Sequence, residues 1–448
     1  KQDAMKVLLT HIILLLTSIT LTAQPITWQK TYGDSNIDYG YSIVQTPDLG
    51  YITVGRKRIG SLNYAFAMKL NKYGDTAWTR LYTDFEAKKI ILTSDGKYVI
   101  TTSSLMIKID IDGNLIWQVP AFSQKILPGL HGELLGIQNL MLRKYGPNGK
   151  IVWSRDFSKT INGYFVDIAL NSINELVLIG NLNNSLTGNR IVLRTDLDGN
   201  EISRTSFFWA VNPAYIIPAE NNSFVLSGSW SPRLAKFDST ASIMWDSSYS
   251  VSLPEYFETF HSIKTFNGGY ALAGYYRNGD YDYYVNLLKI DSIGNKSWSR
   301  TFGFGDHDEA RFVQQTSDSG FAIIGFRDNF NLGDIYVLKT DTEGYIFPPS
   351  TINDPEYIAT VGGFILYPNY PNPFNSTTRI RFYIPISTFV SLKIMDITGR
   401  LVVQLAGRKF LSGEHEFEFN TGVLSSGVYF CLMETPNARR TMKLFLTK

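Results

Sequence analysis

From Trp28 to Phe347 the sequence alternates short apolar runs with tight turns, and no apolar stripe follows a helical period. The run Tyr270-Ala271-Leu272-Ala273 is typical, because it follows the turn Asn267-Gly268 and ends at Gly274. Asn-Gly and Asp-Gly pairs supply the positive φ that hairpin turns need, and short apolar runs between such turns indicate buried strands. We therefore predict an all-β fold for this region.

A spaced motif divides the region into units. A basic residue is followed by an acidic or polar residue two positions later, by Gly five positions later and by Trp nine positions later, as in Lys108, Asp110, Gly113 and Trp117. Further copies, several of them degenerate, begin at Lys69, Lys144, Arg194, Lys236, Lys289 and Lys339. In the copy that begins at Arg194, serine replaces the tryptophan. We interpret the tryptophans as core wedges between neighbouring units.

The units have the length of propeller blades. The marker of each copy is its Trp position, which is Ser203 in the fourth copy and falls near residue 348 in the last. Successive markers, starting from Trp28, lie 36 to 53 residues apart, which gives seven units. Such a period, with about four short strands in each unit, is typical of a β-propeller. Trp28 to Tyr32 is a closing strand with no unit before it, whereas the last unit lacks that strand. We predict a seven-bladed β-propeller over residues 24–347, in which the first strand completes the seventh blade. Six or eight blades remain alternatives, because the copies near Trp153 and Ser203 are degenerate.

A second module follows a linker over residues 348–363. Ile380, Phe382 and Ile384 alternate with more polar residues, and further runs of this kind continue to Leu446. Such alternation predicts strands with one buried face. Several short strands within residues 364–448 predict an immunoglobulin-like β-sandwich.

This module also resembles a known family. The motifs that carry the resemblance are Tyr370-Pro371-Asn372-Pro373-Phe374-Asn375, Asp396-Ile397-Thr398-Gly399-Arg400, Ser412-Gly413-Glu414-His415, Leu424-Ser425-Ser426-Gly427-Val428-Tyr429-Phe430 and Lys443-Leu444-Phe445-Leu446. In this order they look like the type A C-terminal sorting domain of the type IX secretion system. The hallmark positions of that family fall on Gly399, Ser426, Gly427, Val428 and Tyr429.

The resemblance implies a route and a set of partners. Members of the family cross the inner membrane with a signal peptide, fold in the periplasm and leave through the type IX secretion machinery. A sortase-like protease then removes the domain and usually attaches the protein to surface lipopolysaccharide. We therefore expect a secreted or cell-surface protein. The alternative is an adhesive sandwich that stays attached to the propeller.

The N-terminal segment fits this route. Lys6 precedes an apolar run that is broken by His11 and Thr17, and the small residue Ala23 follows. A basic start, a short apolar run and a small residue at its end are typical of a secretory signal peptide, and the run is shorter than the ~20 apolar residues of a membrane span. We expect a signal peptide over residues 1–23, with residues 1–4 upstream of a start at Met5. Cleavage is expected between Ala23 and Gln24.

Charge and composition exclude several classes of function and of binding site. The chain has 42 basic and 40 acidic residues without a basic block, which argues against nucleic-acid binding. The single cysteine, Cys431, excludes intrachain disulfides and thiolate metal clusters. Residues 110–114 and 196–200 look like calcium loops, but they lack the glutamate of such loops and are interpreted as turns. We predict no metal and no cofactor.

Among the histidines of the chain, His307 has the sequence neighbours best suited to catalysis or ligand binding. It lies between Asp306 and Asp308, an arrangement that suits a catalytic base or a ligand. However, Asp308 recurs as Asp38 in the first repeat, and we assign Glu258 to the same place in another repeat. A carboxylate that recurs in several blades favours a structural role over a catalytic one.

A tyrosine-rich segment is the best candidate for ligand contacts. Tyr281, Tyr283 and Tyr284 combine apolar ring faces with hydroxyl groups, as sugar-binding loops do, although alternating tyrosines are also typical of strand packing. We predict a propeller that acts in binding, adhesion or scaffolding, with surface glycans or proteins as partners. The alternative is a propeller that binds or degrades polysaccharide, with His307 and Asp308 as its catalytic candidates.

Overall fold

The structure is a computed structural model, and it describes residues 25–34, 36–83, 86–120, 125–183, 188–228, 232–249, 256–277, 282–303, 307–329, 332–346, 365–366, 369, 372–384, 388–410, 413–422, 424–435 and 439–447. The expected signal peptide with its cleavage site at Ala23 and Gln24, the linker 348–363 and Tyr281 lie outside these residues. Within the described ranges, no helix is long and apolar enough to span a membrane.

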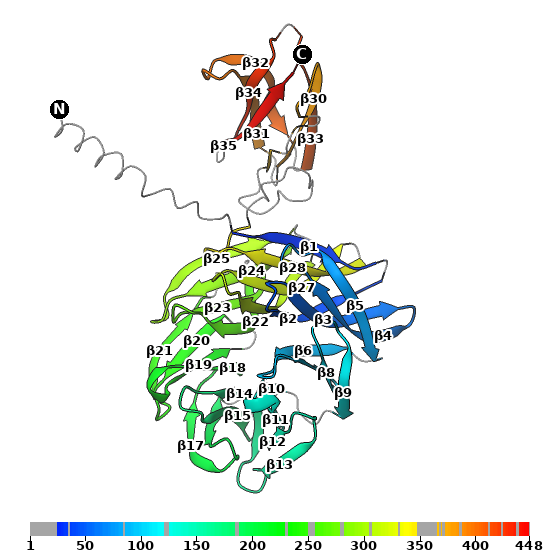
Figure 1. Ribbon diagram of the computed structural model, residues 1–448. Helices are drawn as coiled ribbons and strands as arrows, with labels where there is room; N and C mark the ends of the chain where they lie inside the picture. Colours follow the sequence, from blue (N-terminus) through cyan, green and yellow to red (C-terminus); the bar gives the residue numbers. More distant parts are fainter. Residues whose placement is uncertain are drawn as a thin grey trace, which may run out of the picture.

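Residues 28–340 form seven four-stranded antiparallel units that follow one another around a ring (Figure 1), counted over the described ranges. Blade 1 is β2 (Tyr39–Gln45), β3 (Tyr51–Ile59), β4 (Leu62–Leu70) and β5 (Thr76–Thr83). Blade 2 is β6 (Ala87–Leu92), β7 (Tyr98–Thr102), β8 (Leu105–Ile109) and β9 (Leu115–Pro120). Blade 3 is β10 (Lys125–Pro128), β11 (Leu134–Gln138), β12 (Met141–Tyr145) and β13 (Ile151–Asp156). Blade 4 is β14 (Gly163–Leu170), β15 (Leu176–Leu182), β16 (Asn189–Thr195) and β17 (Glu201–Phe208).

The remaining blades complete the circle. Blade 5 is β18 (Pro213–Pro218), β19 (Phe224–Gly228), β20 (Arg233–Phe237) and β21 (Ile243–Ser248). Blade 6 is β22 (Tyr256–Lys264), β23 (Tyr270–Arg277), β24 (Tyr283–Ile290) and β25 (Lys296–Phe302). Blade 7 is β26 (His307–Gln315), β27 (Phe321–Asn329), β28 (Leu332–Thr340) and β1 (Trp28–Tyr32). Short 3-10 turns at Leu130–Gly132 and Glu220–Asn222 precede β11 and β19.

The first strand closes the ring, as the sequence predicts. β1 pairs antiparallel with β28, in a register that runs from Trp28 opposite Lys339 to Tyr32 opposite Ile335. The seventh blade is therefore built from both ends of the propeller sequence, and the seven-bladed count is confirmed. This closure supplies the outer strand of the seventh blade.

The spaced motif is explained by contacts between neighbouring blades. In six positions around the ring, a Trp on the outer strand of one blade lies against the motif Gly of the next blade. The pairs are Trp28 with Gly74, Trp78 with Gly113, Trp117 with Gly149, Trp153 with Gly199, Trp245 with Gly294 and Trp298 with Gly344. Each of these glycines has a positive φ and leaves no room for a Cβ beside the indole. The predicted role of the tryptophans as wedges between blades is thus confirmed.

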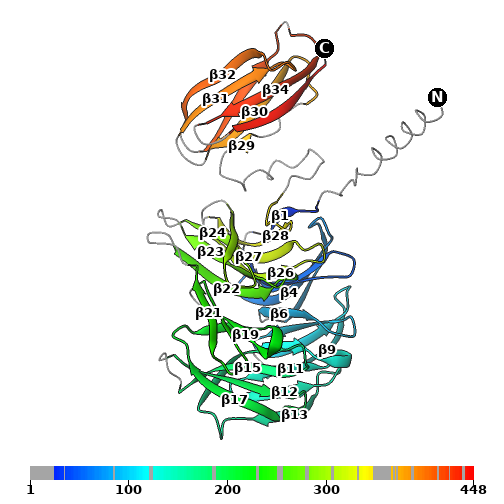
Figure 2. The same cartoon turned by 90° about the vertical axis from the view of Figure 1, so that its left-hand side faces the viewer.

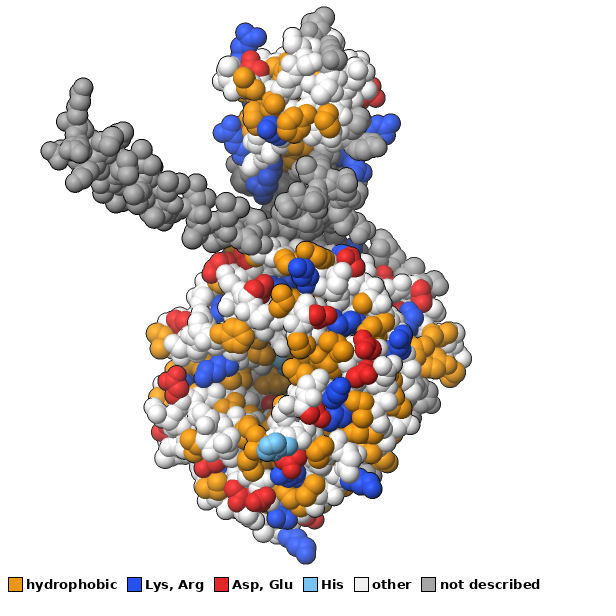
Figure 3. All heavy atoms as spheres, viewed as in Figure 1, with side chains coloured by type: hydrophobic (Ala, Val, Ile, Leu, Met, Phe, Trp, Pro, Cys, Tyr) orange, Lys and Arg blue, Asp and Glu red, His pale blue; other side chains and the backbone are white. Residues whose placement is uncertain are grey.

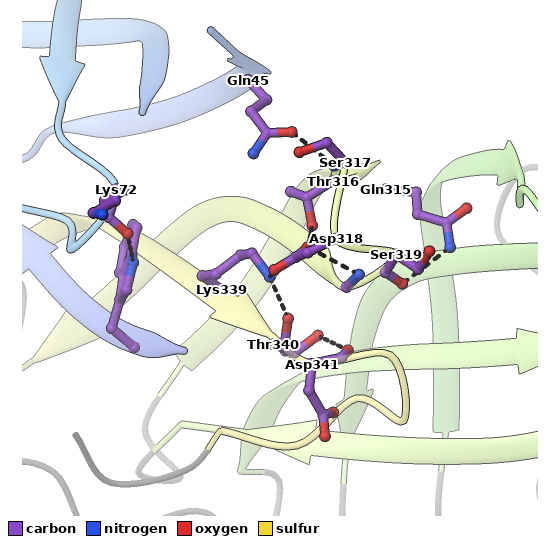
Figure 4. A network of polar contacts seen from close by, with 12 residues as sticks. Gln45, Lys72, Gln315, Thr316, Ser317, Asp318, Ser319, Lys339, Thr340 and Asp341 are labelled. Carbon is purple, nitrogen blue, oxygen red and sulfur yellow. Dashed lines mark hydrogen bonds and ion pairs between the residues drawn. The ribbon is translucent and has the colours of Figure 1, made fainter. Parts of the chain in front are cut away.

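The basic residue of the motif ties two hairpins of one blade together. In blade 7 the Lys339 ammonium pairs with the Asp318 carboxylate at 2.9 Å and donates to the Thr340 carbonyl at 2.6 Å (Figure 4). Equivalent ion pairs join Lys69 to Asp48, Lys108 to Asp95 and Lys144 to Glu133. The acidic residue of the motif caps its own turn, since Asp110 Oδ1 accepts hydrogen bonds from two backbone N–H groups. The motif is therefore structural throughout.

The C-terminal module consists of two sheets with one shared core (Figure 2). One sheet contains β29 (Ile365–Leu366), β30 (Thr377–Ile384) and β33 (Gly413–Asn420). The other contains β32 (Leu401–Phe410), β31 (Thr388–Met395), β34 (Gly427–Glu434) and β35 (Arg439–Leu446). Ile380 and Phe382 from the first sheet pack with Val390, Leu392 and Cys431 from the second. The expected pair of packed sheets is confirmed, and the immunoglobulin-like topology stays a prediction.

Candidate binding site in the central channel

The innermost strand of every blade faces the axis of the ring. These strands are β2, β6, β10, β14, β18, β22 and β26, and each contacts the innermost strands of the blades beside it. Figure 3 shows that the middle of the ring is hollowed. In six of the seven strands the pairing with the next strand shifts by one residue, which marks a β-bulge. A bulge bends the strand and changes the direction of a side chain.

One residue from each blade occupies the same position, which directly follows the bulge in the six strands that have one. The register is fixed by the hairpin that comes next, because the backbone N–H four residues later always donates to the carbonyl that closes the turn, as Thr46 does to Gly50. We call this set of seven residues the channel layer. Its members are Ser42, Lys89, Lys125, Asp167, Tyr215, His261 and Phe312.

The channel layer converges on the axis. Lys125 of blade 3 lies over the ring of Tyr215 of blade 5 at 4.3 Å, which spans blade 4, and it also approaches the Asp167 carboxylate at 3.9 Å. Tyr215 contacts His261 edge to face at 4.9 Å, and His261 stacks on Phe312 at 3.8 Å. The Lys125 side chain keeps 29% of its surface accessible although protein surrounds it. The layer therefore lines a channel that water enters.

Burial and like charges shift the proton equilibria of the channel layer. Burial lowers the pKa of Lys89 to about 8, and the neighbouring Lys125 ammonium acts in the same direction. Burial also holds the pKa of His261 well below its ordinary value, assisted by the charges of Lys89 and Lys125. His261 is thus neutral at pH 7. Because its Nδ1 accepts a hydrogen bond from the Val313 N–H at 3.4 Å, the proton is on Nε2, which is left as a donor.

In three blades a carboxylate lies three residues before the channel layer. Glu86, Glu258 and Glu309 occupy this position in blades 2, 6 and 7. The register corrects the assignment made from the sequence, because Glu258 aligns with Glu309 and not with Asp308. The correspondence between Asp308 and Asp38 holds in the structure, since each precedes the channel layer by four residues.

Aromatic side chains from blades 6 and 7 form a continuous path beside these carboxylates, which we call the mouth. His307 stacks on Tyr283 at 4.3 Å, Tyr283 meets Tyr275 edge to face at 5.0 Å, and Tyr275 lies 5.8 Å from Phe260, the bulge residue before His261. The backbone pairs the two blades at the same point, Tyr283 with His307. The path therefore leads from the rim of the propeller to the channel layer.

Charged groups are held at fixed positions along this aromatic path. The Tyr275 hydroxyl donates to Glu258 at 2.5 Å, which, after burial, helps to raise the pKa of Tyr275. Arg311 pairs with Glu309, and its guanidinium lies over the Phe260 ring at 4.3 Å. Outside the mouth, between blades 1 and 2, Glu86 binds both Lys88 and the Tyr41 hydroxyl. The mouth thus combines apolar ring faces with oriented hydrogen-bonding groups.

The structure separates His307 from Asp308. As successive residues of β26 they point to opposite faces of the blade, so that His307 is exposed and Asp308 is fully buried. The Asp308 carboxylate lies where a Cβ on Gly303 would be and is 3.8 Å from Arg327 Nε. These two residues therefore do not form a common site, and a catalytic role for either stays a prediction. His307 instead meets Tyr283, the other sequence candidate, whereas Tyr284 points away toward Tyr276.

The hallmark residues of the sorting module lie at a turn and at the start of one strand. Gly399 has φ +81 in a turn capped by Asp396, and Gly427 and Val428 begin β34. The Tyr429 hydroxyl donates to the Ser425 carbonyl at 2.9 Å, and Ser426 is exposed. Their role in sorting stays a prediction.

Sequence reasoning missed the whole channel layer. Its seven members share a position but no residue type, and a repeat search depends on shared residue types. The signal that can locate them is the hairpin turn four residues downstream, which recurs in every blade.

Comparison with known proteins identifies the C-terminal module. Residues 369–447 match the secretion system C-terminal sorting domain. The protein is therefore an exported β-propeller with a type IX sorting domain, and it reaches the cell surface or the medium. The sorting domain also makes the type IX secretion machinery a partner. No curated protein matches this sequence.

Several solved structures are similar to the chain. The extracellular domain of BT4673 from B. thetaiotaomicron is 9% identical with a TM-score of 0.48, and the match covers 94% of this chain and 59% of that one. PorZ, a surface component of the type-IX secretion system of Porphyromonas gingivalis, is 12% identical with a TM-score of 0.47, over 93% and 60% of the two chains. Virginiamycin B lyase from Staphylococcus aureus is 12% identical with a TM-score of 0.48, over 70% and 99%. The chain thus spans about three fifths of the first two structures. Likeness at this level carries no information on ligand or activity.

Proposed function

We propose that the propeller is a carbohydrate-binding module that the sorting domain delivers to the outside of the cell. The observation that carries this proposal is the mouth, where the stacked rings of His307 and Tyr283 lead past Tyr275 to Phe260. Sugars present apolar ring faces and hydroxyl groups together. Aromatic rings next to fixed carboxylates and guanidinium groups match both features.

The carboxylates of the mouth are suited to binding sugar hydroxyls. Glu258 and Glu309 are both buried, and each already has a partner, Tyr275 and Arg311 respectively. These partners orient the carboxylate oxygens, whose remaining lone pairs accept further hydrogen bonds. Charged acceptors form stronger hydrogen bonds than neutral ones. The mouth is thus organised before a ligand arrives, which reduces the entropy lost on binding.

A glycan array with the purified propeller tests this proposal. Binding should occur with the wild-type protein and fall at least tenfold in Tyr283→Ala and in His307→Ala, because each substitution removes one ring of the stacked pair. The matched control is Tyr164→Ala in blade 4. Tyr164 holds the position of Glu258 and Glu309 on the other side of the ring. An array without any bound glycan, or equal loss in all three variants, would refute the proposal.

The fate of the sorting domain belongs to the same proposal. We infer that a sortase-like protease cuts between Phe347 and Asn369 after export and that the propeller, residues 24–347, remains at the surface. The sequence supports this order, since the segment between the last blade and the matched domain holds the Pro-rich linker. Mass spectrometry of the surface form checks the cut, and a mature protein that keeps Tyr429 contradicts it.

A further inference from the structure

The channel layer contains more positive than negative charge. Lys89 and Lys125 contribute two cations, Asp167 contributes one anion, and His261 is neutral, which leaves an excess of one positive charge. Lys125 and Asp167 satisfy each other, and Asp167 also accepts the Ile216 N–H at 3.0 Å. Among the described residues, Lys89 forms no ion pair and no hydrogen bond that the structure records.

An ammonium in this position is costly without a partner. A charge that protein surrounds loses part of its hydration, and such charges are normally paired. The depressed pKa of Lys89 reports the same cost. The groups that face Lys89 from other blades are Lys125, Asp167 and His261. Asp167 attracts the Lys89 ammonium, but no ion pair joins the two side chains among the described residues, and Lys125 repels it. The His261 Nε2–H adds a second donor that is not used by Val313.

We propose that the channel layer binds the carboxylate of an acidic sugar, with Lys89 as the charge partner and His261 as a hydrogen-bond donor. The excess of one positive charge matches a monoanion. The aromatic path of the mouth leads to this layer, so that a sugar ring on Phe260 and Tyr275 places a carboxylate beside the adjacent His261. The identity of the ligand as a sugar rests on the proposed function, whereas the anion site rests on the charges of the channel.

The test compares two probes that differ only at the group in question. D-galacturonate and D-galactose share their ring stereochemistry, and the first carries a carboxylate where the second carries a hydroxymethyl group. Isothermal titration calorimetry with the full chain should show at least tenfold tighter binding of galacturonate. Lys89→Gln should abolish this preference. Lys88→Gln is the matched control, because Lys88 is the next residue along the chain but is exposed and already paired with Glu86.

A second variant guards against loss of folding. Asp167→Asn keeps an oxygen for the Ile216 N–H and raises the excess charge of the layer, so that galacturonate should bind several-fold more tightly. Opposite effects of the two variants cannot arise from unfolding. Equal affinity for both sugars, an equal loss in Lys88→Gln, or competition by inorganic phosphate as strong as that by galacturonate would overturn the inference. Binding of neutral glycans that depends on Tyr283 but not on Lys89 would leave the proposed function intact and refute the channel site.

Discussion

The indole of Trp298 lies so close to Gly344 that a Cβ at Gly344 would be 2.7 Å from two carbons of the ring. Gly344 also has φ +76, a conformation that L-residues seldom adopt. The contact joins blade 6 to blade 7. The same contact recurs around the ring. Each motif glycine is therefore required for two reasons: the positive φ of its own turn and the indole of the preceding blade, which leaves no space for a Cβ.

This contact predicts the effect of Gly344→Ala. The substitution should destabilise the propeller by about 2–4 kcal/mol, of which about 1–2 is the cost of a left-handed backbone and the remainder is overpacking against Trp298. Gly96→Ala is the control, since Gly96 has φ +73 with nothing within 4 Å of its Cβ position. Urea denaturation measures both variants. Equal losses at the two sites would show that the indole contact contributes nothing.

The contact between blades 4 and 5 lacks both the Trp and the Gly of the other blade contacts, and this exception predicts that the two positions are energetically coupled. Ser203 stands where the outer strand of blade 4 should carry Trp, and the next blade has Ala241, with φ +65, where the others have Gly. A Cβ is tolerated there because no indole covers it. Ala241→Gly with Ser203→Trp should restore the common contact, whereas Ser203→Trp alone should destabilise. A double-mutant cycle should give a coupling energy of about 1–3 kcal/mol, and strict additivity would contradict the explanation.

Stability should fall in mild acid because of His261. Its pKa is depressed in the folded protein and is about 6.5 in the unfolded chain, so that the unfolded state binds more protons below pH 6.5. The loss should reach at most about 1.4 kcal/mol for each pH unit between 6.5 and the folded value. His261→Gln, which keeps an acceptor for Val313, should flatten the profile of denaturation midpoints between pH 7 and 5. An unchanged slope in the variant would assign the acid sensitivity to other groups.

The sorting domain predicts where a truncated protein accumulates. A chain that lacks residues 364–448 should fold and remain in the periplasm, because the propeller carries its own cores in every blade and loses only its export signal. Cell fractionation with an antibody to the propeller measures this outcome. The converse fusion, residues 364–448 on an unrelated periplasmic domain, should be exported. Surface display of the truncated chain would show that export depends on the propeller.

The regular features of this fold could be predicted from the sequence, but its channel could not. Contacts between blades use the same residue types each time, so that Trp117 and Gly149 reveal a pattern shared with Trp298 and Gly344. The channel differs, because each blade contributes a single side chain there and nothing requires Lys89 to resemble Phe312. The proposed binding site depends on this dissimilarity. The strand register, which the sequence does not show, places Glu258 with Glu309 and not with Asp308.

The pairing of β1 with β28 joins the two ends of the propeller sequence in one blade. The Tyr336 hydroxyl reaches the Gln29 side chain across 307 positions of the chain, and the seventh blade has only three strands until that meeting takes place. In a chain whose N-terminus emerges first, β1 therefore has no strand partner until β28 has followed. The strand that completes the ring begins at Trp28, close behind the cleavage site that the sequence predicts between Ala23 and Gln24, so that a leader retained at this end would stay attached to the closing strand.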